Sequence, residues 1–257
     1  MEDLTGLELA RLFFEEAVAP VVASALPGRP YTAGLIGPCS DVLGLDDAIS
    51  RDHGWGPRCT VLLDADGYGD ARATLDTALR AGLPCRFRGH TTSFEGPHCR
   101  PVAVDRPPVQ HWIDIATPAA FLERNLGVTD ASRLAPVDWL TLHEHRLLTV
   151  VAGALFHDDL GFAATRQLLA FYPDDVRRHV IAAEWQKIAQ EQAFPGRAGA
   201  RGDEVGAAIT TARLVESLAR LCFYVERVYP PYSKWFGSAL RRLGCGDVYD
   251  RLAAVLS

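Results

Sequence analysis

Residues 37–58 read Gly-Pro-Cys-Ser-Asp-Val-Leu-Gly-Leu-Asp-Asp-Ala-Ile-Ser-Arg-Asp-His-Gly-Trp-Gly-Pro-Arg, and they set the architecture of the first half of the chain. An apolar segment precedes them at residues 31–36, and another follows at residues 59–63. Short apolar runs bounded by Gly and Pro are typical of buried strands. The small residues Cys39 and Ser40 favour a turn whose backbone amides bind an anion. The sequence therefore predicts two strands connected through an anion-binding turn.

This order of elements resembles the nucleotidyltransferase superfamily, in which a Gly-Ser turn is followed by a strand-borne Asp-x-Asp pair that holds magnesium. It is most similar to an uncharacterised bacterial family of that superfamily, which shares the Ser-Arg-Asp-His-x-Trp-Gly-Pro-Arg run at residues 50–58. A second shared motif, Tyr-x-x-Tyr-Ser-Lys-Trp, occupies residues 229–235. Similar segments occur at residues 171–176, 184–185 and 201–206, so the resemblance covers most of the chain.

Two residues depart from the family pattern. Cys39 stands where the turn glycine is expected, and Gly54 stands where the second metal-binding aspartate is expected. Glycine has no side chain to coordinate a cation, so we expect a degenerate metal site that holds no metal. If a metal is bound, Asp52 and Asp114 are its expected ligands. Alternation in the strand predicted over residues 110–115 gives Asp114 two interpretations, a third carboxylate of the site or a solvated strand-end residue.

Composition describes an ordinary globular chain. With 257 residues and 48% hydrophobic content it can bury a full core. The net charge of -6 argues against a broad nucleic-acid surface. The N-terminus lacks the basic start of a signal peptide, and no apolar run is long enough for a bilayer. Six cysteines without zinc-like spacing are typical of reduced thiols, so we expect a cytoplasmic protein that binds neither membrane nor nucleic acid.

The patterns predict an α/β (α+β) fold with two domains. The resemblance implies that residues 1–116 form a nucleotidyltransferase-like domain, with an N-terminal helix on a small mixed sheet, and that residues 117–257 form a helical bundle. From the patterns we expect helices at 7–25 and 70–81, strands at 31–36, 59–63, 84–88, 101–105 and 110–115, and a loop at 89–97. After Pro118 only helices are expected, at 119–125, 137–154, 163–169, 174–193, 203–228 and 234–243.

Three residues are the predicted catalytic groups: Asp52, His53 and Lys234. His53 serves as a general base if Gly54 breaks the strand and lets the imidazole turn inward. Lys234 lies at a predicted helix start, where the helix dipole disfavours a cation unless it meets an anion. The alternative for Lys234 is a solvated lysine whose stem covers Trp235.

Six further residues are predicted to bind the anionic substrate: Ser40, Arg58, Arg197, Arg201, Asp203 and Tyr232. Guanidinium pairs suit phosphate or sulfate. The alternatives are a structural pair of Arg58 with Asp52 and a helix cap at Asp203. His143 and His145 are interpreted as surface residues. Arg213, Arg220 and Arg227, spaced seven apart, are interpreted as a solvated or salt-bridged face.

Three functions compete. The first is a repurposed enzyme of specialised metabolism that acts on a small molecule, free or carrier-bound, with a phosphate or sulfate group. It displaces that group without a cofactor while an internal nucleophile closes a ring, as in aziridine formation. The second is a conventional nucleotidyltransferase that uses magnesium and a nucleoside triphosphate. The third is a non-catalytic partner, a binding or scaffolding subunit for another protein that inherited the fold and lost the chemistry. The missing carboxylate at Gly54 favours the first.

Overall fold

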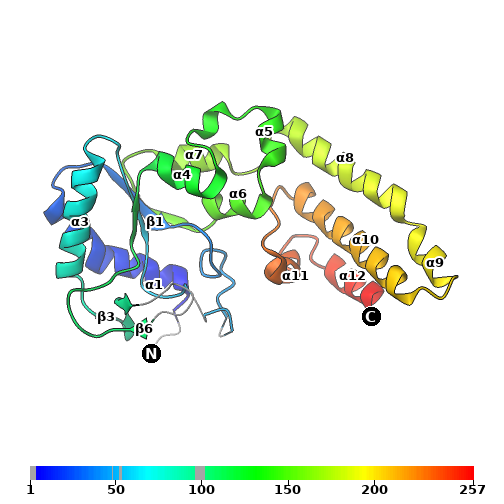
Figure 1. The fold of residues 1–257 in the computed structure, drawn as a ribbon, viewed down its shortest axis with the longest axis horizontal. Coiled ribbons are helices and arrows are strands. Elements are labelled where there is room, and N and C mark those ends of the chain that lie inside the picture. Colours follow the sequence, from blue (N-terminus) through cyan, green and yellow to red (C-terminus); the bar gives the residue numbers. More distant parts are fainter. Residues whose placement is uncertain (1–3, 48, 52–53, 96–101) are drawn as a thin grey trace. The chain divides into compact units, whose positions relative to one another are not determined.

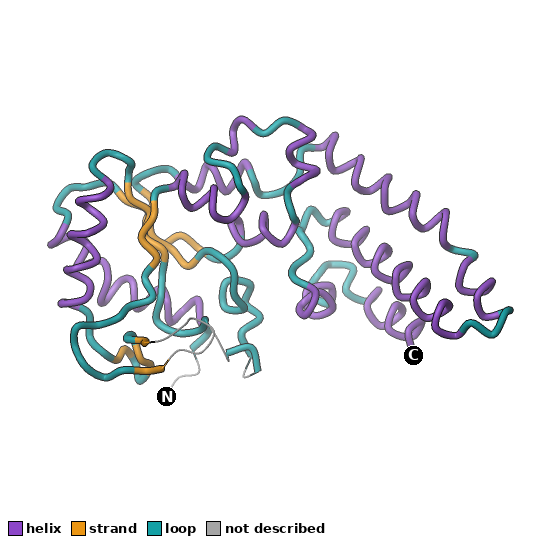
Figure 2. Tube along the Cα trace, viewed as in Figure 1, coloured by secondary structure: helices purple, strands orange, loops and turns teal. Residues whose placement is uncertain are grey.

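A computed structural model describes residues 4–47, 49–51, 54–95 and 102–257. Contacts divide the chain into two units. Unit 1 comprises Met1–Arg133 and Thr149–Ala170, and unit 2 comprises Leu134–Leu148 and Phe171–Ser257. The described strands all belong to unit 1, whereas the described part of unit 2 is built from helices and loops (Figures 1 and 2).

The N-terminal helix is continuous in its path but not in its hydrogen bonding. It consists of α1 (Gly6–Phe13), the π-helical turn η1 (Phe14–Val18) and α2 (Ala19–Ala25). Thr5 and Glu8 form a capping box at its start, which satisfies two otherwise unpaired amides. This confirms the helix expected over residues 7–25. Its buried face consists of Leu9, Phe13, Phe14, Val18 and Val22.

The main sheet of unit 1 has four strands in the order β7-β2-β1-β8. They are β1 (Tyr31–Leu35), β2 (Thr60–Leu63), β7 (Asp114–Ala116) and β8 (Ala154–Asp158). β1 pairs antiparallel with both β2 and β8, while β2 pairs parallel with β7. A small mixed sheet with helices is the α/β fold that the sequence predicts.

The prediction that no strand follows Pro118 is wrong. The segment expected as one helix over residues 137–154 forms two, the short α5 (Pro136–Thr141) and α6 (Glu144–Val151). The chain then enters the sheet as β8. Gly34 makes this pairing possible, since a Cβ there would lie 2.4 Å from the carbonyl oxygen of Ala154. β8 pairs with a strand more than a hundred residues earlier, so the local pattern carries no signal for it.

Helices cover the sheet. α3 (Tyr68–Gly82) contacts β2, β7 and α2, α4 (Pro118–Leu126) contacts β2, and α7 (Phe162–Leu168) contacts β8 and the short helix η2 (Ala131–Arg133). The core that α3 shares with the N-terminal helix includes Val61, Leu63, Leu75, Leu79 and Ile115.

Two short hairpins lie between α3 and β7. They pair β3 (Arg86–Phe87) with β4 (His90–Thr91), and β5 (Phe94–Glu95) with β6 (Val102–Ala103). The segment expected as a loop over residues 89–97 therefore contributes two short strands, and the part beyond Glu95 lies outside the described residues. Strands this short gain their order from pairing rather than from β-propensity.

Unit 2 is organised around two long helices that lie side by side (Figure 1). They are α8 (Asp174–Glu191) and α10 (Glu204–Val225), with α9 (Phe194–Gly199) between them. The chain continues through η3 (Ser233–Trp235), α11 (Phe236–Leu240) and α12 (Val248–Leu256), and α12 contacts α10. These positions confirm the helices expected over residues 174–193 and 203–228.

An aromatic cluster joins segments of unit 2 that lie far apart in sequence. Tyr229 is 1% exposed, and its ring centroid lies 4.9 Å from that of Phe171 and 5.1 Å from that of Tyr172. Tyr172 also contacts Trp139 and Tyr224 edge to face. Aromatic pairs of this kind contribute about 0.5–1.5 kcal/mol each beyond their buried area. The family-like segments at 171–176 and 229–235 thus form part of the core of unit 2.

Candidate functional site

The turn after β1 is closed by its own backbone. The amides of Leu43 and Leu45 both donate to the carbonyl of Ser40, at 3.1 and 2.8 Å. Cys39 has φ of 145°, a conformation that glycine favours. The backbone of this turn therefore keeps a geometry suited to the glycine that the family resemblance implies, although the residue is cysteine.

Two amides of the turn have no hydrogen-bond acceptor within the described ranges. They belong to Ser40 and Asp41, both of which are buried residues. Buried amides in native proteins nearly always have partners. By contrast, the Ser40 hydroxyl donates to the carbonyl of Ser50 at 2.8 Å, so this side chain holds the turn together. An anion at this turn would meet backbone amides rather than the Ser40 hydroxyl.

Arg58 pairs with a buried carboxylate. Its NH2 group lies 2.6 Å from Oδ1 of Asp41, whose side chain has no exposed surface. Oδ1 also accepts from the amide of Val42, while Oδ2 has no hydrogen-bond partner among the described residues. Burial raises the pKa of Asp41, and the Arg58 guanidinium opposes that rise. Arg58 therefore forms a structural pair with Asp41, which the sequence did not predict, while the expected partner Asp52 lies outside the described residues.

The neighbouring acids of the motif are also engaged. Asp46 accepts hydrogen bonds from the Gly6 amide at 2.7 Å and from Nε1 of Trp55 at 3.0 Å, which ties the motif to the start of α1. Asp47 accepts from the amides of Ile49 and Ser50 and so caps the following turn. Both carboxylates hold the local backbone in place.

The two departures from the family pattern lie against each other. Gly54 has φ of 66°, and a Cβ placed on it would lie 2.9 Å from Sγ of Cys39. That separation is too short for a normal contact, so a side chain at position 54 would require the Cys39 thiol to rotate away. The two positions that depart from the expected pattern are therefore neighbours in space.

Asp114 forms an ion pair with an arginine of the next helix. Arg124 on α4 contacts both of its carboxylate oxygens, with NH1 at 3.1 Å from Oδ1 and NH2 on Oδ2. Asp52 and His53 lie outside the described residues. With glycine at position 54 and Asp114 paired to Arg124, the described residues do not fit a magnesium site built from several carboxylates.

Unit 2 carries the other predicted residues. Lys234 is exposed, and its Nζ lies 4.4 Å from the ring centroid of Trp235. Arg197 and Arg201 are exposed. Asp203 accepts from the amide of Gly206 at 2.8 Å and caps α10, the alternative noted for it. Lys234 belongs to unit 2 and Ser40 to unit 1, so a common anion site for the two residues stays a prediction.

Tyr232 lines a cavity of about 390 Å³ in unit 2. Histidines interpreted above as surface residues, His143 and His145, line it as well, with ring centroids 5.2 Å apart. Burial, then the neighbouring His143 ring, lowers the pKa of His145, so this imidazole is neutral near pH 7. The remaining lining residues are Glu144, Glu216, Arg220, Pro230, Pro231, Ser233 and Phe236.

Arg220 is fixed between two carboxylates of this cavity. Its NH1 contacts Oε2 of Glu144, and its Nε lies 3.1 Å from Oε1 of Glu216. The other carboxylate oxygen of Glu144 accepts from the hydroxyl of Tyr224. The seven-residue spacing gave no sign of this, because Glu144 lies 76 residues before Arg220. Arg213 and Arg227 instead pair with Glu191 and Asp174, as a salt-bridged face would.

Residues 139–236 match DUF4037, a domain of unknown function. This segment, from α5 to the start of α11, is therefore similar to an uncharacterised family. Neither the curated proteins nor the solved structures contain a match to the chain. No helix in the described part of the chain is long and apolar enough to cross a membrane. Over the same residues, no three His, Cys, Asp or Glu side chains are grouped as metal ligands.

The Asp41–Arg58 pair predicts a pH-dependent loss of stability. In Arg58→Met the buried carboxylate loses its countercharge, which costs about 3–5 kcal/mol near neutral pH. The folded-state pKa of Asp41 then rises further above its unfolded value, so the cost is present above that pKa and shrinks as pH falls through it. Chemical denaturation of variant and wild type at about pH 7.5 and about pH 5 should show a smaller difference at the lower pH.

The control for that experiment is Asp41→Asn in the Arg58→Met background, which should recover part of the stability at the higher pH. An equal loss at both pH values would contradict the assignment of Asp41 as the partner of Arg58.

The contact between Cys39 and Gly54 predicts coupled substitutions. Gly54→Ala should destabilise the protein by the left-handed backbone cost, about 1–2 kcal/mol, and by overlap with Sγ of Cys39. In a Cys39→Ala background only the backbone cost remains. A double-mutant cycle by denaturant unfolding should therefore give a coupling energy of about 0.5–3 kcal/mol.

Gly161 supplies the matched control, since it has φ of 68° and nothing within 4 Å of an added Cβ. Gly161→Ala and Cys39→Ala should be additive. Additivity of Cys39→Ala with Gly54→Ala would show instead that the two positions are independent.

Proposed function

We propose that the protein is an enzyme of specialised metabolism, in which a modified nucleotidyltransferase-like unit displaces phosphate or sulfate from a small molecule without magnesium. The observation that carries this proposal is the contact of Cys39 with Gly54. Glycine at position 54 has no carboxylate to coordinate magnesium. A side chain placed there would also lie against the thiol of Cys39. The pairing of Asp114 with Arg124 supports the same conclusion, because it neutralises the other expected carboxylate.

The anionic group is proposed to bind at the turn after β1. The amides of Ser40 and Asp41 have no recorded acceptor among the described residues and suit an oxyanion of phosphate or sulfate. Because Arg58 is paired with Asp41, we propose that it contributes positive potential near the turn rather than a bidentate contact with the anion. Arg197, Arg201 and Lys234 belong to unit 2, where all three side chains are exposed.

The proposed reaction is an internal displacement. An amine nitrogen of the substrate attacks the carbon that bears the sulfate, the C–N bond forms as the C–O bond breaks, and sulfate leaves with the bonding electron pair. The product is a three-membered aziridine ring, and the ammonium proton passes to a base, for which we propose His53 or Asp52. The protein accelerates this step by holding nitrogen and carbon in line and by stabilising the charge on the leaving group.

A magnesium-dependent nucleotidyltransferase is the alternative. It requires carboxylates around the cation, and the described residues provide glycine at position 54 and a paired Asp114. The structure therefore gives this alternative less support.

The proposal predicts turnover in the presence of a chelator. The purified protein should release sulfate from 2-aminoethyl hydrogen sulfate, or phosphate from O-phosphoethanolamine, with equal rates in EDTA and in magnesium. Ion chromatography measures the anion, and mass spectrometry measures the aziridine. His53→Gln or Asp52→Asn should lower the rate about 100-fold or more if that residue is the base.

Arg133→Gln, at an exposed position of unit 1, is the matched control and should leave the rate unchanged. Release that disappears in EDTA would contradict the proposal. So would the absence of release from a panel of amino sulfates and amino phosphates, which would favour the role of a non-catalytic subunit.

A further inference from the structure

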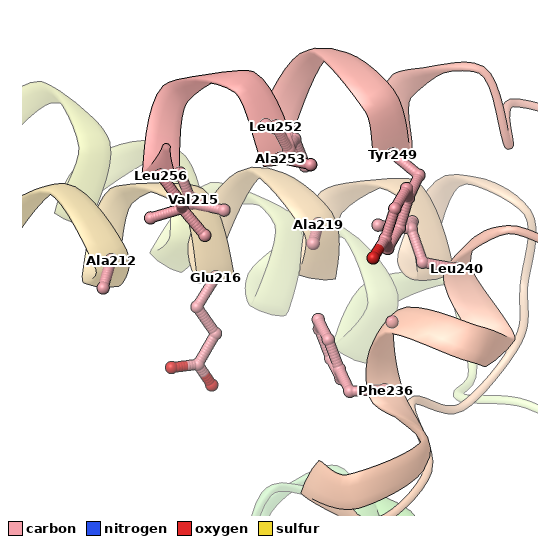
Figure 3. Close-up of a pocket in the computed structure, with 11 residues that line it drawn as sticks. Ala212, Val215, Glu216, Ala219, Phe236, Leu240, Tyr249, Leu252, Ala253 and Leu256 are labelled. Carbon is pink, nitrogen blue, oxygen red and sulfur yellow. The ribbon is translucent and has the colours of Figure 1, made fainter.

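Two cavities in unit 2 share a wall. The first has a volume of about 270 Å³ and lies among α10, α11 and α12 (Figure 3). The second is the polar cavity that contains Tyr232. Glu216 and Phe236 line both, so the two cavities adjoin. All lining residues belong to unit 2, and the inference drawn from them does not depend on the proposed function.

The first cavity is apolar because of its small side chains. Ala212 and Ala219 on α10 and Ala253 on α12 line it, and alanine leaves room where larger residues would fill the space (Figure 3). Leucines and aromatic rings complete the wall, at Leu240, Tyr249, Leu252, Leu256 and Phe236. Such a cavity suits a short hydrocarbon chain, each buried methylene of which contributes about 0.8 kcal/mol.

The second cavity carries a negative charge near neutral pH. Its charged lining residues are Glu144, Glu216 and Arg220, so two carboxylates oppose one guanidinium and one negative charge is left over. Lys234 is not among the lining residues, and burial lowers the pKa of His145. The charge of this cavity is therefore complementary to a cation.

Glu216 is placed to receive that cation. Its side chain is 56% exposed, and Arg220 contacts only Oε1, which leaves Oε2 for a ligand. Figure 3 shows the carboxylate pointing away from α12, while the apolar residues of the first cavity line its other side. A molecule with a hydrocarbon chain and an ammonium group would thus have its chain between α10 and α12 and its charge at Glu216.

We propose that unit 2 binds a small amphiphilic amine, with its hydrocarbon chain in the apolar cavity and its ammonium group against the Glu216 carboxylate. A fatty carboxylate would meet the surplus negative charge and is disfavoured. A short amine would satisfy Glu216 but leave the apolar cavity unfilled.

Calorimetry of the full chain at about pH 7.5, where His145 is neutral, tests the proposal with four probes: n-octylamine, octanoate, 1-octanol and n-propylamine. Octylamine should bind at least about tenfold more tightly than each of the others. Glu216→Gln should weaken octylamine by about tenfold and leave octanol unchanged, since it removes charge and keeps size.

Ala212→Phe and Ala253→Phe should both abolish octylamine binding by filling the apolar cavity. Both positions are exposed, so the substitutions are compatible with folding, and circular dichroism checks it. Ala208→Phe is the matched control, since it lies on an exposed position of α10 and does not line the cavity.

Several results would overturn the proposal. These are octanoate or octanol binding as tightly as octylamine, equal losses in Ala208→Phe and Ala212→Phe, or no binding of octylamine. A dimer seen by sedimentation and disrupted by Ala212→Phe would likewise overturn it, because a second copy would then be the occupant of the apolar cavity.

Discussion

The interpretation of unit 1 depends on the position of the Cys39 thiol. Its Sγ lies next to the place where a side chain on Gly54 would begin. A Cβ at position 54 would lie 2.9 Å from this thiol, so a side chain there would require the thiol to rotate away, and the left-handed backbone of Gly54 adds strain. The rest of the turn is ordered around it. Asp41 is held by Arg58, and Asp46 by the start of α1 and by Trp55. The turn is therefore ordered by these contacts, while Gly54 offers no carboxylate to a metal ion.

Unit 2 depends on a different interaction, the placement of Arg220 between Glu144 and Glu216. Glu144 lies at the start of α6 and Arg220 in the last quarter of α10, so the ion pair connects two helices that are far apart in the sequence. The Tyr172, Tyr224 and Tyr229 cluster packs against this network and shields part of it from water. Removing either partner of a partly buried pair leaves the other charge uncompensated, which destabilises the fold. This explains why tyrosine-rich segments so far apart in the sequence belong to one core.

The sequence predicted the elements whose signal is local. The helix over residues 7–25, the strands at 31–36 and 59–63 and the long helices of unit 2 follow from periodicity and from Gly and Pro boundaries. β8 did not follow, because its strand character comes from pairing with β1 across more than a hundred residues and from the missing side chain of Gly34.

For the same reason Asp41 was not expected as the partner of Arg58, nor Glu144 as the partner of Arg220. Ion pairs across the fold are invisible to spacing rules. The polar cavity with His143 and His145 was missed because two-residue spacing on a helix gives no common face, whereas both histidines border the same space in three dimensions.

The proposed function follows from the glycine at position 54, which cannot coordinate magnesium. Its central claim is that the protein no longer uses magnesium and a nucleotide. Calorimetry of the wild-type protein with ATP and the other nucleoside triphosphates, in magnesium and in EDTA, tests this claim most directly. The account predicts no magnesium-dependent binding of any nucleoside triphosphate. Binding that appears with magnesium and disappears in EDTA would contradict it.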